Sequence, residues 1–498
     1  MTALEPHLPI LQVLVPLFGA LLTAFMRAGT RAWLLATVVA WASAAISVML
    51  LVRVLGRSEP ISYTMGNWAV PWGIEYRVDI LNAFVLFFVT GIGAILMPYA
   101  RRSVGSEILS HQQAWFYTMY LLCLTGLAGI TVTGDAFNVF VFLEISSLST
   151  YGLIALGQNR RALLASYQYL IVGTIGATFY VIGVGLLFLV TGSLNLHDIA
   201  GLLADAYIVY PRPVLTALAF LIAGISLKLA LFPLHLWLPN AYAYAPSTAA
   251  AFLAGTATKV AVYLLIRILF SVFGLAIVVT SLPVEEVLIL LSAAAMVIAS
   301  ISAIFETNAK RMLAYSSVAQ LGYITLGIAL ANQSGLTGGI VHLFNHALTK
   351  TTLFVCLGAM AYHGCRMRFT DLAGIGRKMP FTSAAFVIAG LSIIGVPGTA
   401  GFISKWYLAL GAIEAGYWPL VFLIVVSSLL AVIYIGRFVE VAYFRETSEA
   451  AAGAYEPPWS MLWPILVLAA ATIYFGIDTR ASAGIAAQAT EYLLGGLR

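Results

Sequence analysis

The sequence carries very little charge. Only 9% of its 498 residues are Asp, Glu, Lys or Arg, whereas these residues make up about a quarter of an ordinary soluble domain. Hydrophobic residues account for 61% of the chain, and the mean hydropathy is +0.98. A soluble fold cannot hide so much apolar surface, so we expect a polytopic membrane protein. The composition also excludes a disordered chain and a typical nucleic-acid-binding protein.

Cysteine and cofactor-binding motifs are scarce as well. The chain has three cysteines, too few for the four thiolates of an iron–sulfur cluster or for a disulfide-rich secreted fold. It contains no CxxC motif, no GxGxxG motif at a strand–helix junction and no Walker loop. The sequence therefore gives no reason to expect a bound cofactor or metal.

Apolar runs recur along the whole chain. A helix needs about 20 residues to cross the hydrocarbon core of a bilayer. By this measure the sequence predicts an all-α protein with about fourteen transmembrane helices, in one transmembrane unit covering residues 1–498. The predicted spans lie near residues 9–26, 33–52, 79–99, 113–132, 135–157, 163–190, 213–238, 246–270, 285–305, 311–331, 335–362, 381–411, 417–443 and 461–478.

Two of these spans contain a helix breaker well inside them. Pro233 lies in the seventh span and Pro397 in the twelfth, five helices apart. One such proline predicts only a kink, but breaks at matching places in two five-helix blocks are typical of transporters with inverted repeats. We therefore predict two repeats, helices 4–8 at about residues 113–270 and helices 9–13 at about residues 285–443.

The basic residues of the loops predict the orientation. Cytoplasmic loops of membrane proteins are enriched in Lys and Arg. Loops after even-numbered spans hold Arg53, Arg57, Arg77 and Arg212, with Arg267 at a helix end. Loops after odd-numbered spans hold the larger set, which is Arg27, Arg31, Arg101, Arg102, Arg160, Arg161, Lys310, Arg311, Arg366, Arg368, Arg377, Lys378, Arg437 and Arg445. We therefore place the odd loops in the cytoplasm and both termini on the outer side.

A few charged residues lie inside the predicted membrane spans, where a charge raises the free energy of the inserted helix. Lys228, Lys259, Lys350, Lys405 and Glu144 fall inside predicted spans. Each charge near the bilayer centre costs about 2.5–3.5 kcal/mol on the insertion scale. Nearly all arginines lie in loops or at helix ends, and the cations within the spans are lysines. Because a buried lysine can lose its proton whereas arginine stays charged, this choice predicts a buried proton relay.

Histidines add to this pattern. His342, His346 and Lys350 follow one another at intervals of four residues, so they share one face of a helix. A single histidine of this kind is more often a satisfied core residue, but three titratable groups on one stripe favour a relay. For His235, just after Pro233, a core position and a place in a half-channel beside the broken helix remain equally open.

Several segments with these residues resemble a known family. They are similar to the proton-pumping antiporter-like subunits shared by respiratory complex I, membrane-bound hydrogenases and Mrp-type cation/proton antiporters. The resemblance extends from the fifth to the twelfth span, and the helix count continues it over nearly the whole chain. The segments that carry it are LEISSLSTYGLIALG at 143–157, SLKLALFPLHLWLPNAYAYAPS at 226–247, GTATKVAVYLLIR at 255–267, KRMLAYSSVAQLGY at 310–323, HLFNHALTKTTLF at 342–354 and GVPGTAGFISKWYL at 395–408.

The resemblance implies a role for each charged residue within the spans. Subunits of this family bind no cofactor and carry a row of polar groups in the plane of the membrane. By this resemblance, the row in the present chain consists of Glu144 paired with Lys228, then Lys259, then the central His342, His346 and Lys350, and finally Lys405 at the far end.

Within the family, the chain is most similar to the D subunit of Mrp antiporters. The segment 255–267 favours that subunit, and Asn240 stands where complex I members usually have Asp. The resemblance implies a non-enzymatic subunit of a hetero-oligomeric antiporter in a prokaryotic cytoplasmic membrane, with partners like Mrp A, B, C, E, F and G. It would exchange Na⁺ or K⁺ for H⁺. The alternative is a proton-pumping subunit of a complex I-like NADH dehydrogenase or an energy-converting hydrogenase. A third possibility is a purely structural membrane scaffold. The buried titratable groups argue against it, because a scaffold gains nothing from the cost of burying them.

Overall fold

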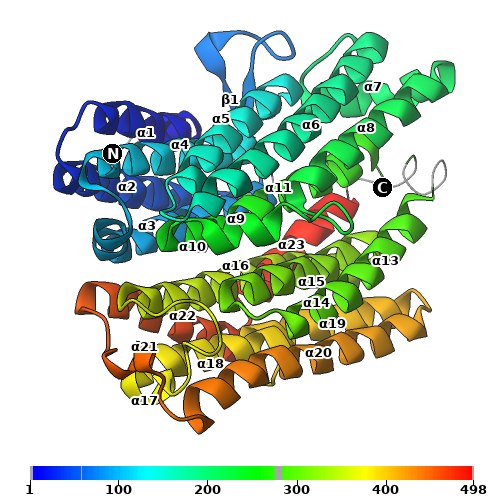
Figure 1. Ribbon diagram of the computed structural model, residues 1–498. Coiled ribbons are helices and arrows are strands. Elements are labelled where there is room, and N and C mark those ends of the chain that lie inside the picture. The colour runs from blue at the N-terminus through cyan, green and yellow to red at the C-terminus, as the bar shows by residue number, and fades with distance from the viewer. Residues whose placement is uncertain (1–3, 58, 275–276, 278–282, 496–498) are drawn as a thin grey trace.

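The computed structural model describes residues 4–57, 59–274, 277 and 283–495. Within these residues, each of the fourteen predicted spans coincides with one helix or with consecutive helices (Figure 1). The chain is thus an all-α, multi-pass membrane protein. In order, the spans are α1 (Leu8–Ala24), α2 (Gly29–Leu55), α3 (Ile80–Glu107), α4 (Gln113–Val132), α5 (Ala136–Ala155), α6 (Arg160–Thr191), α8 (Pro211–Leu229) with α9 (Leu238–Tyr244), α10 (Ser247–Gly255) with α11 (Ala257–Ile266), α13 (Val284–Ala294) with α14 (Ser300–Phe305), α15 (Ala309–Ala329), α16 (Gln333–Tyr362), α18 (Pro380–Ile394) with α19 (Ala400–Glu414), α20 (Trp418–Val439) and α22 (Trp459–Ile477).

Several elements outside the spans were not predicted from the sequence. A hairpin of β1 (Ile61–Thr64) and β2 (Glu75–Val78) pairs antiparallel after the second span, with Tyr63 opposite Tyr76. Its strands are too short to show an alternating pattern. The further helices are α7 (Leu196–Val209) between the sixth and seventh spans, α17 (Ile375–Lys378), α21 (Glu449–Ala452) and the C-terminal α23 (Ser482–Gly495).

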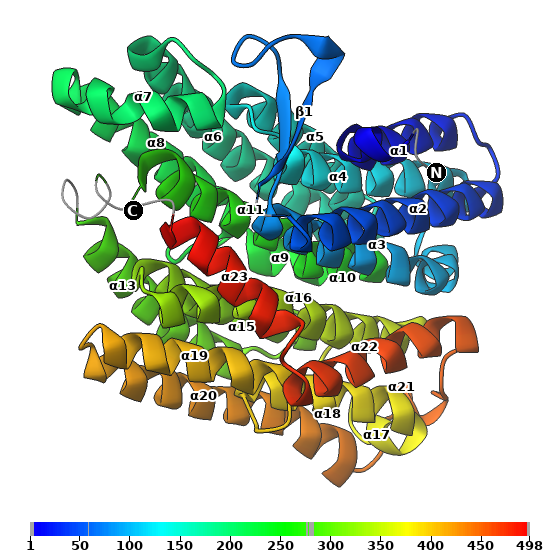
Figure 2. The same cartoon turned by 180° about the vertical axis from the view of Figure 1, so that it is seen from behind.

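The helix α16 lies at the centre of the molecule. In both views, α1–α11 form one half and α13–α22 the other, with α16 along the boundary between them (Figures 1 and 2). It packs against α3 and α10 on one side, α15, α18, α19 and α22 on the other, and α23. Every residue of α16 from Gly335 to Met360 is buried inside the protein. Its polar side chains are therefore shielded from lipid by other helices.

Both prolines lie in breaks, as predicted. The seventh span leaves the helix after Leu229, so the predicted end at residue 238 is wrong, and residues 230–237, which include Pro233, connect α8 to α9. The twelfth span ends its first helix at Ile394 and resumes at Ala400, with Pro397 between them. Gly395 ends α18 with a φ of 90°, a left-handed conformation that glycine adopts without strain. The inverted relationship of the two five-helix blocks stays a prediction.

A third break, in the eighth span, was not predicted. The helix α10 ends at Gly255 and α11 begins at Ala257, while Thr256 has non-helical angles of −125° and −56°. At its other end α11 continues into a π-helical stretch, Arg267–Phe273. The sequence carries no proline here, so this span lacks the signal that marked the other two breaks.

Close packing at the twelfth span predicts a sensitive glycine. A Cβ at Gly401 would overlap the backbone carbonyl of Ser392, because α19 returns close to α18 after the break. We expect Gly401→Ala to lower the free energy of unfolding by about 1–3 kcal/mol, as overpacking does. The matched control is Gly436→Ala in α20, where a new Cβ meets no atom within 4 Å. Thermal unfolding of the purified membrane complex would measure both, and equal stability of the two variants would contradict the prediction.

Candidate functional site

The ammonium group of Lys405 lies at the break of the twelfth span. Its Nζ donates hydrogen bonds to the carbonyls of Ile393 and Ile394, each at 2.9 Å, and to the Ser428 hydroxyl at 2.8 Å. The ring centroid of Tyr323 is 4.6 Å away. The two carbonyls end α18, where the helix dipole places partial negative charge, so the break supplies the acceptors that a buried cation needs.

Lys259 is arranged in the same way at the break of the eighth span. It is fully buried, and its Nζ donates to the carbonyl of Ala254 in the last turn of α10. The Thr258 hydroxyl is a weaker acceptor at 3.4 Å. A cation in the first turn of α11 thus bridges back across the interruption at Thr256. The break at Thr256, which the sequence did not predict, therefore supplies the main hydrogen-bond acceptor of Lys259, which was predicted as a site residue.

Lys350 is held by an unbroken neighbouring helix instead. This fully buried lysine of α16 donates from Nζ to the Leu313 carbonyl and to the Ser316 hydroxyl of α15, both at 2.8 Å. Ser316 donates in turn to the hydroxyl of Tyr434 at 3.0 Å. A chain of neutral hydrogen-bonding groups thus surrounds this ammonium group without a carboxylate.

The two histidines of α16 differ in their contacts. His342 binds through both ring nitrogens, Nδ1 to the Ser404 hydroxyl at 2.7 Å and Nε2 to Gln320 Oε1 at 3.0 Å. His346 lies parallel to it, with ring centroids 6.1 Å apart. It is 2% exposed, yet neither of its ring nitrogens has a hydrogen-bond partner within the described part of the chain. Because buried polar atoms are rarely left unpaired, His346 is an unusual residue for a purely structural core.

Glu144 and Lys228 form a separate group. The Nζ of Lys228, in the last turn of α8, donates to the Ser147 hydroxyl, about one turn beyond Glu144 on α5. The carboxylate and the ammonium group interact electrostatically but make no salt bridge within 4.0 Å. The Glu144 Oε1 atom is buried and has no hydrogen-bond partner among the residues that the structure describes. The implied pairing of Glu144 with Lys228 is thus a neighbourhood rather than a direct contact.

The seven predicted relay residues fall into two groups in space. Lys259 lies within electrostatic range of His342, His346 and Lys350, and His342 lies within range of Lys405. Glu144 and Lys228 form the second group. Among the described residues, no direct interaction joins Lys228 to Lys259. The structure therefore brings five of the seven residues within electrostatic range of one another and leaves Glu144 and Lys228 as a separate pair. The role of each residue stays a prediction.

His235 lies in the first break, as its position after Pro233 indicated. Its ring stacks on Phe232 with centroids 5.2 Å apart and meets the edge of Tyr315 at 6.2 Å. The side chain is 6% exposed, and Nδ1 has no hydrogen-bond partner. These contacts are compatible with either interpretation of His235, as a core residue or in a half-channel.

The burial of two cations was not recognised from the sequence. Lys310 was assigned to a loop, but it is buried in the first turn of α15 and donates to Ser247 at 3.1 Å. Arg267 was placed at a helix end, and the structure shows that it is 8% exposed and forms an ion pair with Asp79. Asp79 and Arg267 are 188 residues apart, so nothing local in the sequence could reveal the pair.

Asp135 is a helix cap. Its carboxylate accepts a hydrogen bond from the Asn138 amide at 2.7 Å and thereby begins α5. Burial in this loop raises the pKa of the Asp135 carboxyl group above its usual value, although the capping hydrogen bonds of Asn138 and Phe137 oppose that rise. The capping bond gives Asp135 a structural role at the start of the fifth span.

Comparison with known proteins identifies the family. Residues 133–431 match the model of the transmembrane family described as NADH:quinone oxidoreductase/Mrp antiporter. The chain belongs to this family. It is 44% identical over 95% of its length to the N subunit of NADH-quinone oxidoreductase from Desulforudis audaxviator, covering 96% of that protein. It is 28% identical to the D subunit of the Na⁺/H⁺ antiporter from Bacillus subtilis, with 97% of both chains covered.

A solved structure extends the likeness to the whole fold. The chain superposes on a subunit in the structure of the Mrp complex from Dietzia sp. DQ12-45-1b with a TM-score of 0.89. The superposition covers 100% of this chain and 98% of the other, at 25% identity. The predicted resemblance to antiporter-like subunits, and to the D subunit of Mrp antiporters, is therefore confirmed.

The contacts of Lys350 predict a specific loss of stability. Ser316→Ala removes one of the two acceptors of a buried ammonium group, and hydrogen bonds to charged groups contribute about 1.5–3 kcal/mol. Ser317 is the matched control, because it is equally buried but donates only to Leu313 of its own helix. We expect Ser316→Ala to unfold at a clearly lower temperature than Ser317→Ala in the same membrane complex. The reverse order would show that Ser316 does not hold Lys350.

Proposed function

We propose that this chain is the proton-translocating subunit of a multisubunit antiporter that exchanges Na⁺ or K⁺ for H⁺. The observation that carries the proposal is the central row of buried titratable groups from Lys259 to Lys405, held by backbone carbonyls and hydroxyls rather than by carboxylates. A whole-chain likeness to a subunit of an Mrp complex and to the D subunit of a Na⁺/H⁺ antiporter supports the choice of an antiporter. The subunit itself catalyses no chemical reaction.

In the proposed mechanism, one relay group at a time changes its charge. An ammonium group that fills the acceptors of a broken helix, as at Lys259 and Lys405, is stabilised while it carries its proton. A positive charge arriving on a neighbour within electrostatic range destabilises that proton and promotes its release. His342 and His346 lie between the two lysines and accept or donate through either ring nitrogen. Proton transfer then proceeds along the membrane plane through His342 and His346.

The membrane location and the partner subunits are inferred from the same resemblance to the family. We place the chain in the cytoplasmic membrane of a prokaryote, with odd-numbered loops inside and both termini outside, as the basic residues of the loops indicate. The partner subunits are like Mrp A, B, C, E, F and G. Glu144 and Lys228 form the entry pair of the relay, and residues 1–498 act as one transmembrane unit built from two inverted repeats.

A second function is favoured by a specific observation. The identity of 44% to the N subunit of NADH-quinone oxidoreductase is higher than that to the antiporter subunit. In that case the same relay would be driven by electron transfer in partner subunits instead of by a cation gradient. Genes for small Mrp-like subunits beside this one would support the antiporter, whereas genes for hydrogenase or iron–sulfur subunits would support the redox pump.

Vesicle transport distinguishes the two functions and tests the relay. We would impose a pH gradient on inverted vesicles from an antiporter-deficient strain that expresses the whole complex, and then add Na⁺ or K⁺. For wild type we expect the gradient to collapse, and for Glu144→Ala, Lys228→Ala and Lys405→Ala we expect no response although the complex assembles. Glu440→Gln, at an exposed surface ion pair, is the control. Wild-type activity in all three variants would refute the relay, and acidification on adding an electron donor would indicate the redox pump.

A conservative change separates charge from proton release. Lys405→Arg keeps a cation that can donate to the carbonyls ending α18, but a guanidinium group does not give up its proton. We therefore expect an assembled complex whose exchange rate falls at least tenfold. Retention of more than half of the wild-type rate would show that Lys405 serves only to cap the helix.

A further inference from the structure

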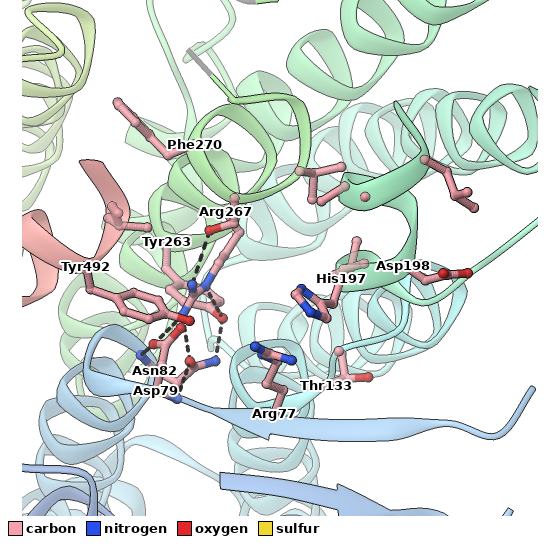
Figure 3. A pocket seen from close by; sticks show the side chains of 18 residues that line it. Arg77, Asp79, Asn82, Thr133, His197, Asp198, Tyr263, Arg267, Phe270 and Tyr492 are labelled. Atoms are coloured by element: carbon pink, nitrogen blue, oxygen red, sulfur yellow. Dashed lines mark hydrogen bonds and ion pairs between the residues drawn. The ribbon is translucent and has the colours of Figure 1, made fainter. Parts of the chain in front are cut away.

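A large pocket opens beside the relay on the face that carries the even-numbered loops. It has a volume of about 720 Å³, and its walls come from β2, α7, the start of α3, the end of the eighth span and α23 (Figure 3). His197, Gly201 and Ser271 are exposed residues of its wall, so the pocket reaches the surface. By the predicted orientation this face is extracytoplasmic.

The floor of this pocket is a buried ion pair. The Nη2 atom of Arg267 donates to Asp79 and to Asn82 Oδ1, the latter at 2.6 Å, and Nη1 donates to Ser271 at 3.2 Å (Figure 3). Asp79 is 4% exposed and also caps α3 through its capping box with Asn82. The pair therefore ties the beginning of α3 to the end of the eighth span. It is buried from lipid but faces the pocket.

A tyrosine lies directly beneath the ion pair. The Tyr263 hydroxyl accepts from Arg267 Nε at 3.1 Å and from Asn82 Nδ2 at 2.7 Å, and it donates to the Thr131 carbonyl at 3.0 Å. Lys259, Tyr263 and Arg267 recur every four residues and therefore share one stripe of the eighth span. The hydroxyl thus links the pocket floor to the helix that carries a relay lysine.

A small cavity at Lys228 lies one helical turn further in. Its volume is about 20 Å³, room for about one water molecule, and its lining includes Lys228 and the hydroxyl-bearing Ser146, Ser147 and Thr150. The same two helices, α4 and α11, that carry Thr131 and Tyr263 also wall this cavity. One turn of each helix, about 5.4 Å, separates the pocket floor from the cavity.

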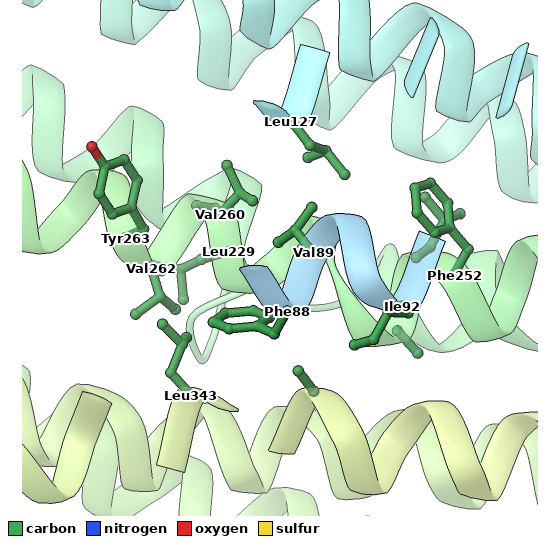
Figure 4. Close-up of a cluster of buried hydrophobic side chains, with 14 of the residues drawn as sticks. Phe88, Val89, Ile92, Leu127, Leu229, Phe252, Val260, Val262, Tyr263 and Leu343 are labelled. Atoms are coloured by element: carbon green, nitrogen blue, oxygen red, sulfur yellow. The ribbon is translucent and has the colours of Figure 1, made fainter. Parts of the chain in front are cut away.

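That turn is apolar in the present conformation. Leu127 of α4 and Val260 of α11 point into the cluster of hydrophobic side chains that also holds Tyr263 (Figure 4). Ile130 and Ala261 line the same cavity, and these four apolar side chains, here called the apolar plug, form its wall on the side of α4 and α11 that carries Thr131 and Tyr263. A proton does not cross such an apolar wall unless the helices move apart and admit water.

The helix α11 is bounded by irregular backbone at both ends. It is a ten-residue helix between the break at Thr256 and the π-helical stretch that starts at Arg267. Such interruptions are places where a helix segment can change its direction, and π-helical turns are frequent at functional sites. A shift of α11 would move Val260 of the plug and Tyr263 together. It would also move Lys259, whose ammonium group spans the break.

The charges of the pocket favour protons over metal cations. The lining carries Arg77 and Arg267 against Asp79 and Asp198, so it has no excess of carboxylates. Within the described residues no group of three or more His, Cys, Asp or Glu side chains could hold a metal ion. The lining therefore offers Na⁺ or K⁺ no cluster of carboxylates, whereas a proton needs only a chain of hydrogen-bonding groups.

We infer that this pocket is an extracytoplasmic proton vestibule of the relay, closed by the Asp79–Arg267 ion pair and opened by movement of α11. This inference rests on the proposed function. When Arg267 leaves Asp79, it also vacates the Tyr263 hydroxyl oxygen, which then accepts a proton from a hydronium ion in the vestibule. The hydroxyl turns away from the Thr131 carbonyl and gives its own proton to water entering past the plug toward Lys228. Each transfer leaves Tyr263 neutral, and the opposite direction uses the same steps in reverse order.

Blocking the vestibule tests this inference. A Cβ at Gly201 would meet no atom within 4 Å, so Gly201→Cys places a thiol in the pocket wall without distorting α7. The native cysteines Cys123, Cys356 and Cys365 are all buried. We would treat the assembled complex with a membrane-impermeant, positively charged thiol reagent, applied to each side of the membrane in turn. We expect labelling from one side only and at least a fivefold fall in the rate of cation-dependent proton exchange.

The control is a cysteine on the same face outside the pocket. Arg480→Cys lies on the exposed loop after the fourteenth span, where the arginine side chain is 91% exposed, and its labelling should leave the rate unchanged. Full labelling of Gly201→Cys with no loss of rate would overturn the vestibule. A complex that shows no exchange even before labelling would count against the proposed function instead, and the gate would then be tested as follows.

A second variant tests the gate without requiring cation exchange. Asp79→Asn keeps a good helix cap for α3 but removes the charge that holds Arg267. Because an unpaired buried guanidinium is costly, we expect Arg267 to turn toward the vestibule and passive proton leak into vesicles to rise severalfold. A purely structural pair would instead give less assembled complex with an unchanged leak. Normal leak in fully assembled Asp79→Asn vesicles would overturn the role of the ion pair as a gate.

Discussion

The structure depends on how a positive charge is stabilised in an apolar protein interior by uncharged hydrogen-bond acceptors. At two of the four lysines the solution is a broken helix, because an interrupted helix offers backbone carbonyls with no partner of their own. Lys405 binds the two carbonyls that end α18, and Lys259 binds the Ala254 carbonyl that ends α10. Each break and each cation satisfy one another, so neither is stable in the membrane alone.

This arrangement also allows the charge to be given up. A carboxylate paired with each lysine would hold the proton more firmly, whereas neutral carbonyls and hydroxyls stabilise the ammonium only moderately. Lys350 illustrates the same choice on an intact helix, since its acceptors are a carbonyl and the Ser316 hydroxyl. Arg267 with Asp79 is the contrasting case, because the cation is permanent and its partner is an anion. Arg267 and the lysines of the central row thus have different partners.

The sequence predicted much of this, for identifiable physical reasons. Spans are readable because the bilayer fixes their length, and the two breaks are readable because proline cannot continue a helix. Lys259 was identified as a site residue, but its break was not, since Gly255 and Thr256 carry no comparable signal. The burial of Lys310 and Arg267 depends on partners more than 60 residues away in the chain. Such contacts follow from the packing of helices and leave no local pattern.

The position of α16 has a consequence for how the protein is made. This helix is the least apolar of the long membrane-spanning helices among the described residues, and it is wholly enclosed by other helices. During synthesis α16 enters the membrane after α3, α10 and α15 but before α18, α19 and α22, so one of its sides meets lipid at first. The Ser404 partner of His342 is made later still. We expect this helix to be retained beside the insertion machinery until the second half arrives. The polar residues of the relay would thus also delay the release of α16 into lipid.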